Sequence, residues 1–163
     1  MEWLWSPWRM AFVSGEAGSS GDSGCIFCDH LAQGDDEGAG ILWRGLHTFV
    51  LLNAFPYNTG HLMVAPLRHR GDLEDLSPDE RAELMEATAR SVGIIRAAMK
   101  AEGFNVGANL GSAAGAGVPG HVHVHVVPRW GGDTNFMPVV GDTKVLPEML
   151  AQTYAKLRPA FDA

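Results

Sequence analysis

Three histidines alternate with valines in the segment HVHVHVV, where His121, His123 and His125 stand two residues apart. Side chains two residues apart on a strand point to the same face, so the pattern predicts three imidazoles on one face and the valines against a core. An imidazole can act as a nucleophile, a proton donor or acceptor, or a metal ligand. A strand rise of about 3.3 Å puts His121 and His125 about 13 Å apart, too far for both to bind one ion. At least one of the three histidines must therefore have a role other than binding that ion.

A glycine-rich segment, GSAAGAGVPG at 111–120, directly precedes these histidines. Its backbone amides can approach an anion closely, because few side chains intervene. A neutral imidazole can attack phosphorus and form a covalent intermediate, and a neighbouring imidazole can donate a hydrogen bond to the phosphoryl oxygens. This interpretation makes His123 the nucleophile. It is favoured over a purely structural histidine row and over a metal-catalytic centre.

The two cysteines of the chain, Cys25 and Cys28, form a C-x-x-C pair. Two cysteines are too few for the disulfide framework of a small secreted domain. The pair is typical of a redox centre or of half a zinc site, and two buried, reduced thiols are the third interpretation. No βαβ pattern surrounds the pair, which favours the metal site.

The elements that must position these residues are expected to form one domain. The chain has 163 residues, of which 46% are hydrophobic and 19% charged, as in a single folded domain. Its formal net charge of −7 argues against nucleic acid or an anionic membrane surface as a partner. Without a long apolar run or the pattern of a signal peptide, the sequence predicts a cytoplasmic protein.

Two parts are predicted along the chain. Residues 1–24 are expected to be an N-terminal segment, in which Trp3, Trp5 and Trp8 precede a flexible loop rich in glycine and serine. Residues 25–163 are expected to form the domain itself.

The domain is predicted to belong to the α+β class, because its strands come in runs instead of alternating strictly with helices. Ser77-Pro78-Asp79-Glu80 predicts the start of a helix of about six turns, with a Ser77 cap and a capping box closed by Glu80. Gly103 is expected to cap its end. A terminal helix is expected from Val145 to Leu157. Short runs rich in β-branched or aromatic residues predict strands at 41–44, 47–53, 61–66, 104–110 and 121–129.

The histidine segment resembles the signature of the histidine triad superfamily of nucleotide hydrolases and transferases. Asn53-x-x-Pro56-x-x-x-Gly60-His61, followed by Val64-Ala65-Pro66, is similar to another motif of that family. The resemblance covers roughly residues 25–130. The flanking segments, WSPWRM at 5–10 and VPRWGGDTNF at 127–136, resemble the bacterial branch that cleaves diadenosine tetraphosphate, including its phosphorylases.

This resemblance implies an antiparallel five-stranded sheet with one long helix and a C-terminal helix, in a homodimer. It also implies cleavage of dinucleoside polyphosphates through a covalent nucleotidyl-histidine, with water or inorganic phosphate as acceptor. His123 would be the nucleophile, His125 would hydrogen-bond the α-phosphate and the bridging oxygen, and His61 would support the site. An adenosine phosphoramidase and a non-catalytic nucleotide-binding protein are the alternatives.

The expected substrate-binding residues surround this group. Asn53 would bind ribose, and Asn109 would approach the ribose or a phosphate. Gly117 stands where hydrolases of the family have Gln or Ser, so Ser112 or a loop amide is the expected substitute. Two residues beyond the histidines could also contact substrate. Arg129 could neutralise the phosphates, although exposed basic residues are usually only solvated. Trp130 could stack on an adenine, and core packing is an equal alternative for it.

Zinc-bearing members of the family complete a C-x-x-C pair with two histidines. In this chain the corresponding residues are His69 and His121. The resemblance therefore implies a structural zinc site made of Cys25, Cys28, His69 and His121.

Overall fold

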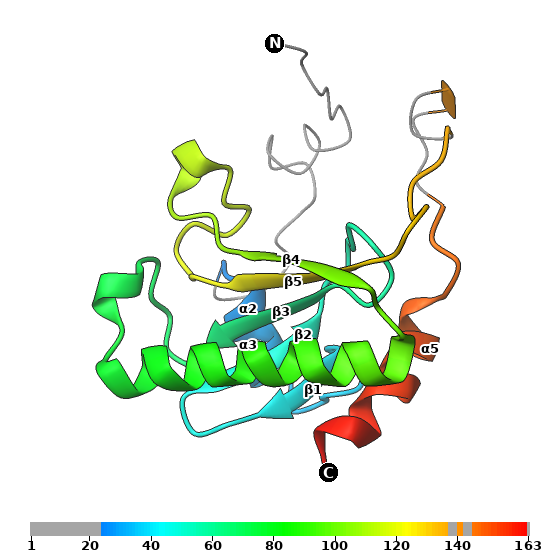
Figure 1. Cartoon of the computed structure of the whole chain (residues 1–163). Helices are drawn as coiled ribbons and strands as arrows, with labels where there is room; N and C mark the ends of the chain where they lie inside the picture. Colours follow the sequence, from blue (N-terminus) through cyan, green and yellow to red (C-terminus); the bar gives the residue numbers. More distant parts are fainter. Residues whose placement is uncertain (1–23, 137–139, 142–144, 163) are drawn as a thin grey trace.

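The computed structural model describes residues 24–136, 140–141 and 145–162, and its centre is one antiparallel sheet (Figure 1). The strands lie in the order β1-β2-β3-β5-β4, so β5 is inserted between β3 and β4. This arrangement confirms the α+β class and the five-stranded sheet. The strands are β1 (Ile41–Arg44), β2 (Thr48–Leu52), β3 (Leu62–Pro66), β4 (Gly103–Gly107) and β5 (Val124–Arg129).

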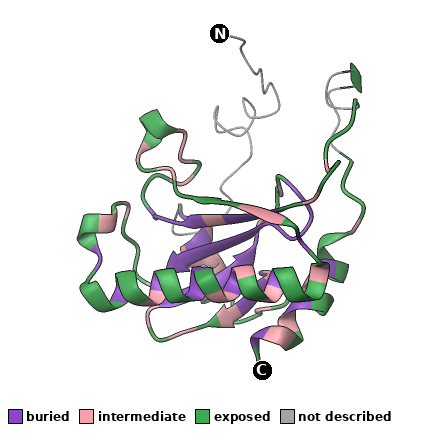
Figure 2. Cartoon of the chain, in the orientation of Figure 1, coloured by how far each residue is buried: buried purple, intermediate pink, exposed green. Residues whose placement is uncertain are grey.

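The sheet is covered on both faces. The long helix α3 (Pro78–Met99) packs on one face, against Val64 and Val126 among others, and the short helix α2 (Ile26–Ala32) packs on the other, against Phe49 and Met63. The central strands β2 and β3 are therefore buried along their whole length (Figure 2). Successive residues of one strand alternate between the two faces, so each central strand contributes to both layers.

The start of α3 confirms the predicted capping box. The backbone N–H of Glu80 donates to Ser77 Oγ at 3.2 Å, and the backbone N–H of Ser77 donates to Glu80 Oε2 at 2.6 Å. The predicted end of the helix was wrong. Lys100, with a φ of 55°, occupies the left-handed capping position, whereas Gly103 begins β4. The chain enters the sheet immediately, because the N–H of Glu102 already donates to the carbonyl of Arg129 at 3.0 Å.

Three other predicted boundaries differ from the structure by three residues or more. The terminal helix α5 spans Leu150–Leu157, so it does not begin at Val145, and a 3-10 turn over Arg158–Phe161 follows it. The strand β4 ends at Gly107, before Asn109. The strand β5 begins at Val124, because the residues before it are bonded outside the ladder: the N–H of Val122 donates to the carbonyl of Arg70 at 2.6 Å. Helix α2 had no counterpart among the predicted elements.

The tryptophan-rich segment and most of the glycine- and serine-rich loop lie outside the described residues. The boundary between residues 24 and 25 therefore stays a prediction. Across the described part of the chain, every helix is too short or too polar to span a bilayer.

Candidate active site and metal centre

The predicted catalytic histidines come together on the face of the sheet that carries α2. His61 directly precedes β3 and is fully buried, His125 lies in β5, and His123 lies just before that strand. His61 Nε2 is 2.9 Å from His125 Nδ1, and the ring centroids of His123 and His125 are 4.9 Å apart. The valines between the histidines pack into the core under α3, so the predicted division of this segment between two faces is confirmed.

The hydrogen bonding of His123 determines which of its ring nitrogens is free to react. His123 Nδ1 lies 2.8 Å from the backbone carbonyl oxygen of His121. A carbonyl oxygen can only accept, so His123 Nδ1 carries the proton and Nε2 keeps its lone pair. Burial lowers the pKa of the His123 imidazole, so the neutral form predominates at neutral pH. His123 thus has the protonation state that a nucleophile needs.

A second chain of hydrogen bonds orients His125. The backbone N–H of Tyr57 donates to His61 Nδ1 at 3.0 Å. His61 therefore carries its proton on Nε2 and donates it to His125 Nδ1, which leaves the other nitrogen of His125 as the N–H donor. The Tyr57 ring covers this pair, with its centroid 4.7 Å from that of His61 and 5.7 Å from that of His125. A lone pair on His123 thus lies beside a proton donor on His125.

The predicted ribose-binding residue Asn53 lies beside this group. Its Nδ2 is 3.4 Å from His61 Nδ1, and its Oδ1 accepts the backbone N–H of Phe55 at 2.9 Å. Three other predicted substrate residues lie in the loop that joins β4 to β5. Asn109 donates to the carbonyl of Gly115 at 3.3 Å and so ties the loop together, whereas Ser112 and Gly117 are exposed. Their contacts with substrate stay predictions.

Arg129 and Trp130 lie at the far end of β5 and contact other parts of this chain. The Arg129 guanidinium donates to both carboxylate oxygens of Asp133, at 2.5 and 2.8 Å. The Trp130 indole N–H lies 3.3 Å from the Met99 carbonyl and 3.1 Å from that of Lys100. At a strand rise of about 3.3 Å, Arg129 is about 13 Å along the chain from the nearest triad histidine. The structure therefore places both residues apart from the histidines, and their predicted roles stay untested.

The four predicted metal ligands form a compact cluster. One ligand atom from each of Cys25, Cys28, His69 and His121 lies within 4.8 Å of all the others. His121 Nδ1 is 3.4 Å from Cys25 Sγ and 3.7 Å from Cys28 Sγ, and His69 Nδ1 is 3.4 Å from Cys28 Sγ. In a tetrahedral zinc site with ordinary bond lengths, nitrogen and sulfur ligands are about 3.6 Å apart. The distances therefore fit a tetrahedral ion.

The protonation chemistry of the cluster also fits a cation. His121 Nε2 lies 2.8 Å from the Pro66 carbonyl and donates to it, so Nδ1 offers its lone pair toward the sulfurs. Burial, and then the neighbouring Cys25 and Asp29, raise the pKa of the Cys28 thiol to about 11. A bound divalent cation stabilises thiolates that would otherwise repel each other. The residues present can hold a metal ion.

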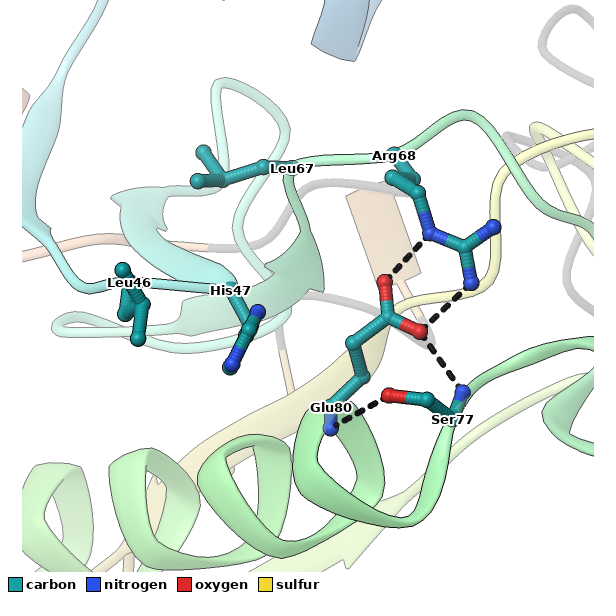
Figure 3. Close-up of a pocket in the computed structure, with 6 residues that line it drawn as sticks. All are labelled: Leu46, His47, Leu67, Arg68, Ser77 and Glu80. Carbon is teal, nitrogen blue, oxygen red and sulfur yellow. Dashed lines mark hydrogen bonds and ion pairs between the residues drawn. The ribbon is translucent and has the colours of Figure 1, made fainter.

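Two cavities lie elsewhere in the described structure. One, of about 290 Å³, lies at the start of α3 and contains the ion pair of Arg68 with Glu80, at 2.5 Å, beside the capping box (Figure 3). Arg68 lowers the pKa of Glu80 to about 2. The other, of about 560 Å³, is lined by residues around Met99 and Trp130. The described residues around either cavity include none of the catalytic candidates, so we interpret the Arg68 cavity as structural.

Sequence reasoning missed several groups that shape this site. Phe27 contacts the rings of both His121 and His123, and Tyr57 contacts His61 and His125. The sequence offered one signal for each: Phe27 lies inside the C-x-x-C segment, and Tyr57 lies inside the Asn53–His61 motif. The carbonyl groups that select the histidine tautomers carry no sequence signal, because every residue has one.

A five-stranded α+β sheet, clustered histidines and a candidate Cys/His metal centre beside them are together the features expected of the histidine triad class of proteins. Residues 40–132 match the model of the HIT domain, and the chain belongs to this histidine triad family. It is 43% identical over 155 residues to a Mycobacterium tuberculosis protein named AP-4-A phosphorylase. The aligned region covers 92% of this chain and 79% of that protein.

Solved structures agree with this membership. A Zn-bound histidine triad family protein from Mycobacterium smegmatis is 26% identical and superposes with a TM-score of 0.69. The match covers 87% of this chain and 96% of that one. The NitFhit protein of C. elegans is 27% identical with a TM-score of 0.60, over 74% of this chain and 27% of the larger protein.

Proposed function

We propose that this protein cleaves dinucleoside polyphosphates such as diadenosine tetraphosphate through a covalent nucleotidyl intermediate on His123. The observation that carries the proposal is the 2.8 Å hydrogen bond from His123 Nδ1 to the His121 carbonyl, because it leaves Nε2 unprotonated. The name of the 43% identical relative, AP-4-A phosphorylase, supports the same substrate and favours inorganic phosphate as the final acceptor.

The first step is attack of His123 Nε2 on the α-phosphorus. A nitrogen–phosphorus bond forms, the bond from phosphorus to the bridging oxygen breaks, and ATP leaves when the substrate is diadenosine tetraphosphate. The N–H of His125, oriented by His61, would stabilise the negative charge that develops on the bridging oxygen. Asn53 would hold the ribose, and the loop with Asn109, Ser112 and Gly117 would offer amides to the phosphates.

The second step transfers the nucleotide to the acceptor. Attack of inorganic phosphate breaks the nitrogen–phosphorus bond, regenerates His123 and releases ADP. Attack of water would release AMP instead. The products therefore identify the acceptor: ADP plus ATP for phosphorolysis, and AMP plus ATP for hydrolysis.

The test compares purified protein with and without inorganic phosphate. Diadenosine tetraphosphate should be converted to ADP and ATP in the presence of phosphate, and to far less product without it. Adenosine phosphoramidate, assayed in parallel, should be the poorer substrate. If it is the better one, or if nucleotide binds tightly without any product over hours, the proposed activity is wrong.

Mass spectrometry locates the intermediate. The protein is quenched during turnover, and the tryptic peptide 101–129, which contains the whole histidine triad, is fragmented. An adenylyl mass on His123 is expected. An adduct on another histidine, or none under conditions of turnover, would contradict the covalent mechanism.

We also propose zinc as the ion held by Cys25, Cys28, His69 and His121, with a structural role. The ligands join α2 to the segments that follow β3 and precede β5, and zinc would stabilise that junction. A thiolate site of this kind fits a reducing compartment, which supports the cytoplasm as location. Elemental analysis of purified protein should give about one zinc per chain.

A homodimer is the proposed assembly. The strand β4 is an edge of the sheet, and Val106 on it is 47% exposed. Edge strands offer unpaired backbone groups to a second copy. Light scattering coupled to size exclusion should report twice the 17.5 kDa mass of the chain.

A further inference from the structure

Phe27 lies between the two cysteines of the metal centre and contacts the histidines on both sides of the site. Its side chain is fully buried. Its ring centroid is 5.1 Å from that of His121 and 4.9 Å from that of His123, and Phe49 packs edge-on against it at 6.3 Å. One aromatic ring therefore joins a candidate metal ligand to the candidate nucleophile.

The ring of His123 is bounded by neighbours of different kinds. His125 packs nearly perpendicular to it, with an interplanar angle of 73°. A single hydrogen bond from Nδ1 to the His121 carbonyl does not by itself prevent the His123 ring from turning about its Cβ–Cγ bond, which would break that hydrogen bond. Phe27 packs tilted against the His123 ring, with an interplanar angle of 46°, and restricts this rotation.

Helix α2 is held in place by the same cluster that holds His121. Cys25 directly precedes the helix and Cys28 lies within it, and both sulfurs approach His121 Nδ1, at 3.4 and 3.7 Å. Phe27 is thus fixed relative to His121, whose own carbonyl accepts the proton of His123. The packing contact and the hydrogen bond act on one imidazole from two directions.

We infer that Phe27 is a positioning residue for His123, so that the C-x-x-C segment contributes to catalysis as well as to stability. This inference rests on the proposed function, in which His123 is the nucleophile. Misplacing a reacting group by about 1 Å can cost about 100-fold in rate, because near-attack geometry is lost. Substrate contacts made by other residues would be unaffected. A change at Phe27 should therefore lower kcat much more than it raises KM.

The kinetic test uses Phe27→Leu and a matched control, Leu31→Ala. Leu31 is on the same helix and packs against the same hydrophobic cluster, so the control also weakens the docking of α2. We expect kcat for phosphorolysis of diadenosine tetraphosphate to fall about 10- to 100-fold in Phe27→Leu, with KM within about twofold. Leu31→Ala should keep kcat within about twofold at a comparable loss of Tm. Equal losses of kcat in the two variants, or an unchanged kcat in Phe27→Leu, would overturn the inference.

A spectroscopic readout separates this inference from the proposed function. In ¹⁵N-histidine-labelled, zinc-loaded protein, long-range ¹H–¹⁵N correlations report which nitrogen of His123 carries the proton. The wild type and Leu31→Ala should show one Nδ1–H tautomer, and Phe27→Leu should show a mixture or an exchange-broadened signal. One unchanged tautomer in Phe27→Leu would contradict the positioning role even if the wild type turns over. A mixture in a wild type lacking activity would instead count against both proposals. An inactive wild type with one tautomer, lost only in Phe27→Leu, would refute the proposed function and the effect of Phe27 on kcat but leave its positioning of the His123 ring in place.

Discussion

The two faces of the sheet use the same strands for different purposes. The face under α3 is lined by aliphatic side chains such as Val64, Val124 and Val126. The face under α2 combines apolar residues with buried imidazoles and thiols. Aliphatic contacts are non-directional and stabilise in rough proportion to the buried area, whereas each buried imidazole needs a specific partner. Stability is therefore spread over the first face, and chemistry depends on a few hydrogen bonds on the second.

The largest effect should come from His123→Ala. Loss of the nucleophile should lower turnover of diadenosine tetraphosphate by at least about 1000-fold and abolish the covalent adduct. The circular dichroism spectrum should change little, because the valines on the other face still pack, whereas the cavity left by the buried imidazole should lower Tm by a few degrees. Turnover within tenfold of the wild type would show that another group attacks phosphorus.

Cys28→Ser should produce the next largest effect, on metal content and stability. Removing one thiolate should reduce bound zinc well below one per chain and lower the free energy of unfolding by about 3 kcal/mol, because metal-binding energy is folding energy. Elemental analysis and urea denaturation measure the two quantities. A chelator should lower the Tm of the wild type but have a much smaller effect on this variant, and equal effects would argue against a structural ion.

Val126→Ala tests the opposite face. Val126 is fully buried under α3, so deleting two methyl groups should cost about 2 kcal/mol of unfolding free energy. The values of kcat and KM at 25 °C should remain within about twofold of the wild type. A large fall in kcat in the folded variant would show that the aliphatic face also controls the geometry of the histidines, and the division between the faces would fail.

The smallest effect is expected from Glu80→Gln, which acts through pH. The ion pair with Arg68 lowers the pKa of Glu80 from its ordinary 4.5 to about 2. A carboxylate whose pKa is lower in the folded state stabilises the protein above its unfolded pKa, and this contribution is lost as the pH falls from about 4.5 toward 2. Urea denaturation between pH 2.5 and 7 should show a shallower decline in stability for the variant. Superimposable pH profiles would contradict the ion pair.

Local signals in the sequence predicted much of the fold. The Ser77–Glu80 capping box and the short runs rich in β-branched or aromatic residues are signals over a few neighbouring positions, so the start of α3 and the existence of five strands could be predicted. The ends of elements were predicted less well. Whether Lys100 or Gly103 ends the helix depends on where the next strand must pair, and that information lies in Arg129, far along the chain.

For the candidate site, too, some features could be predicted from the sequence and others could not. The types and spacing of the histidines and cysteines, with the family resemblance, identified the residues that the fold brings together in two adjacent clusters. The contacts of Phe27 and Tyr57 could not be predicted, because an aromatic residue in a motif does not reveal which ring it packs against. The positions of Arg129 and Trp130, bonded to their own chain, were equally hidden.

The sequence by itself determined which chemical groups are available, because imidazoles, thiols and a glycine-rich loop are properties of residue type and order. Only the tertiary structure decided which nitrogen holds a proton in His61, His121, His123 and His125. That choice depends on carbonyl and amide groups brought within about 3 Å by the packing of β3, β5 and α2. A single imidazole can serve as nucleophile, donor or ligand, and its folded surroundings select one of these roles.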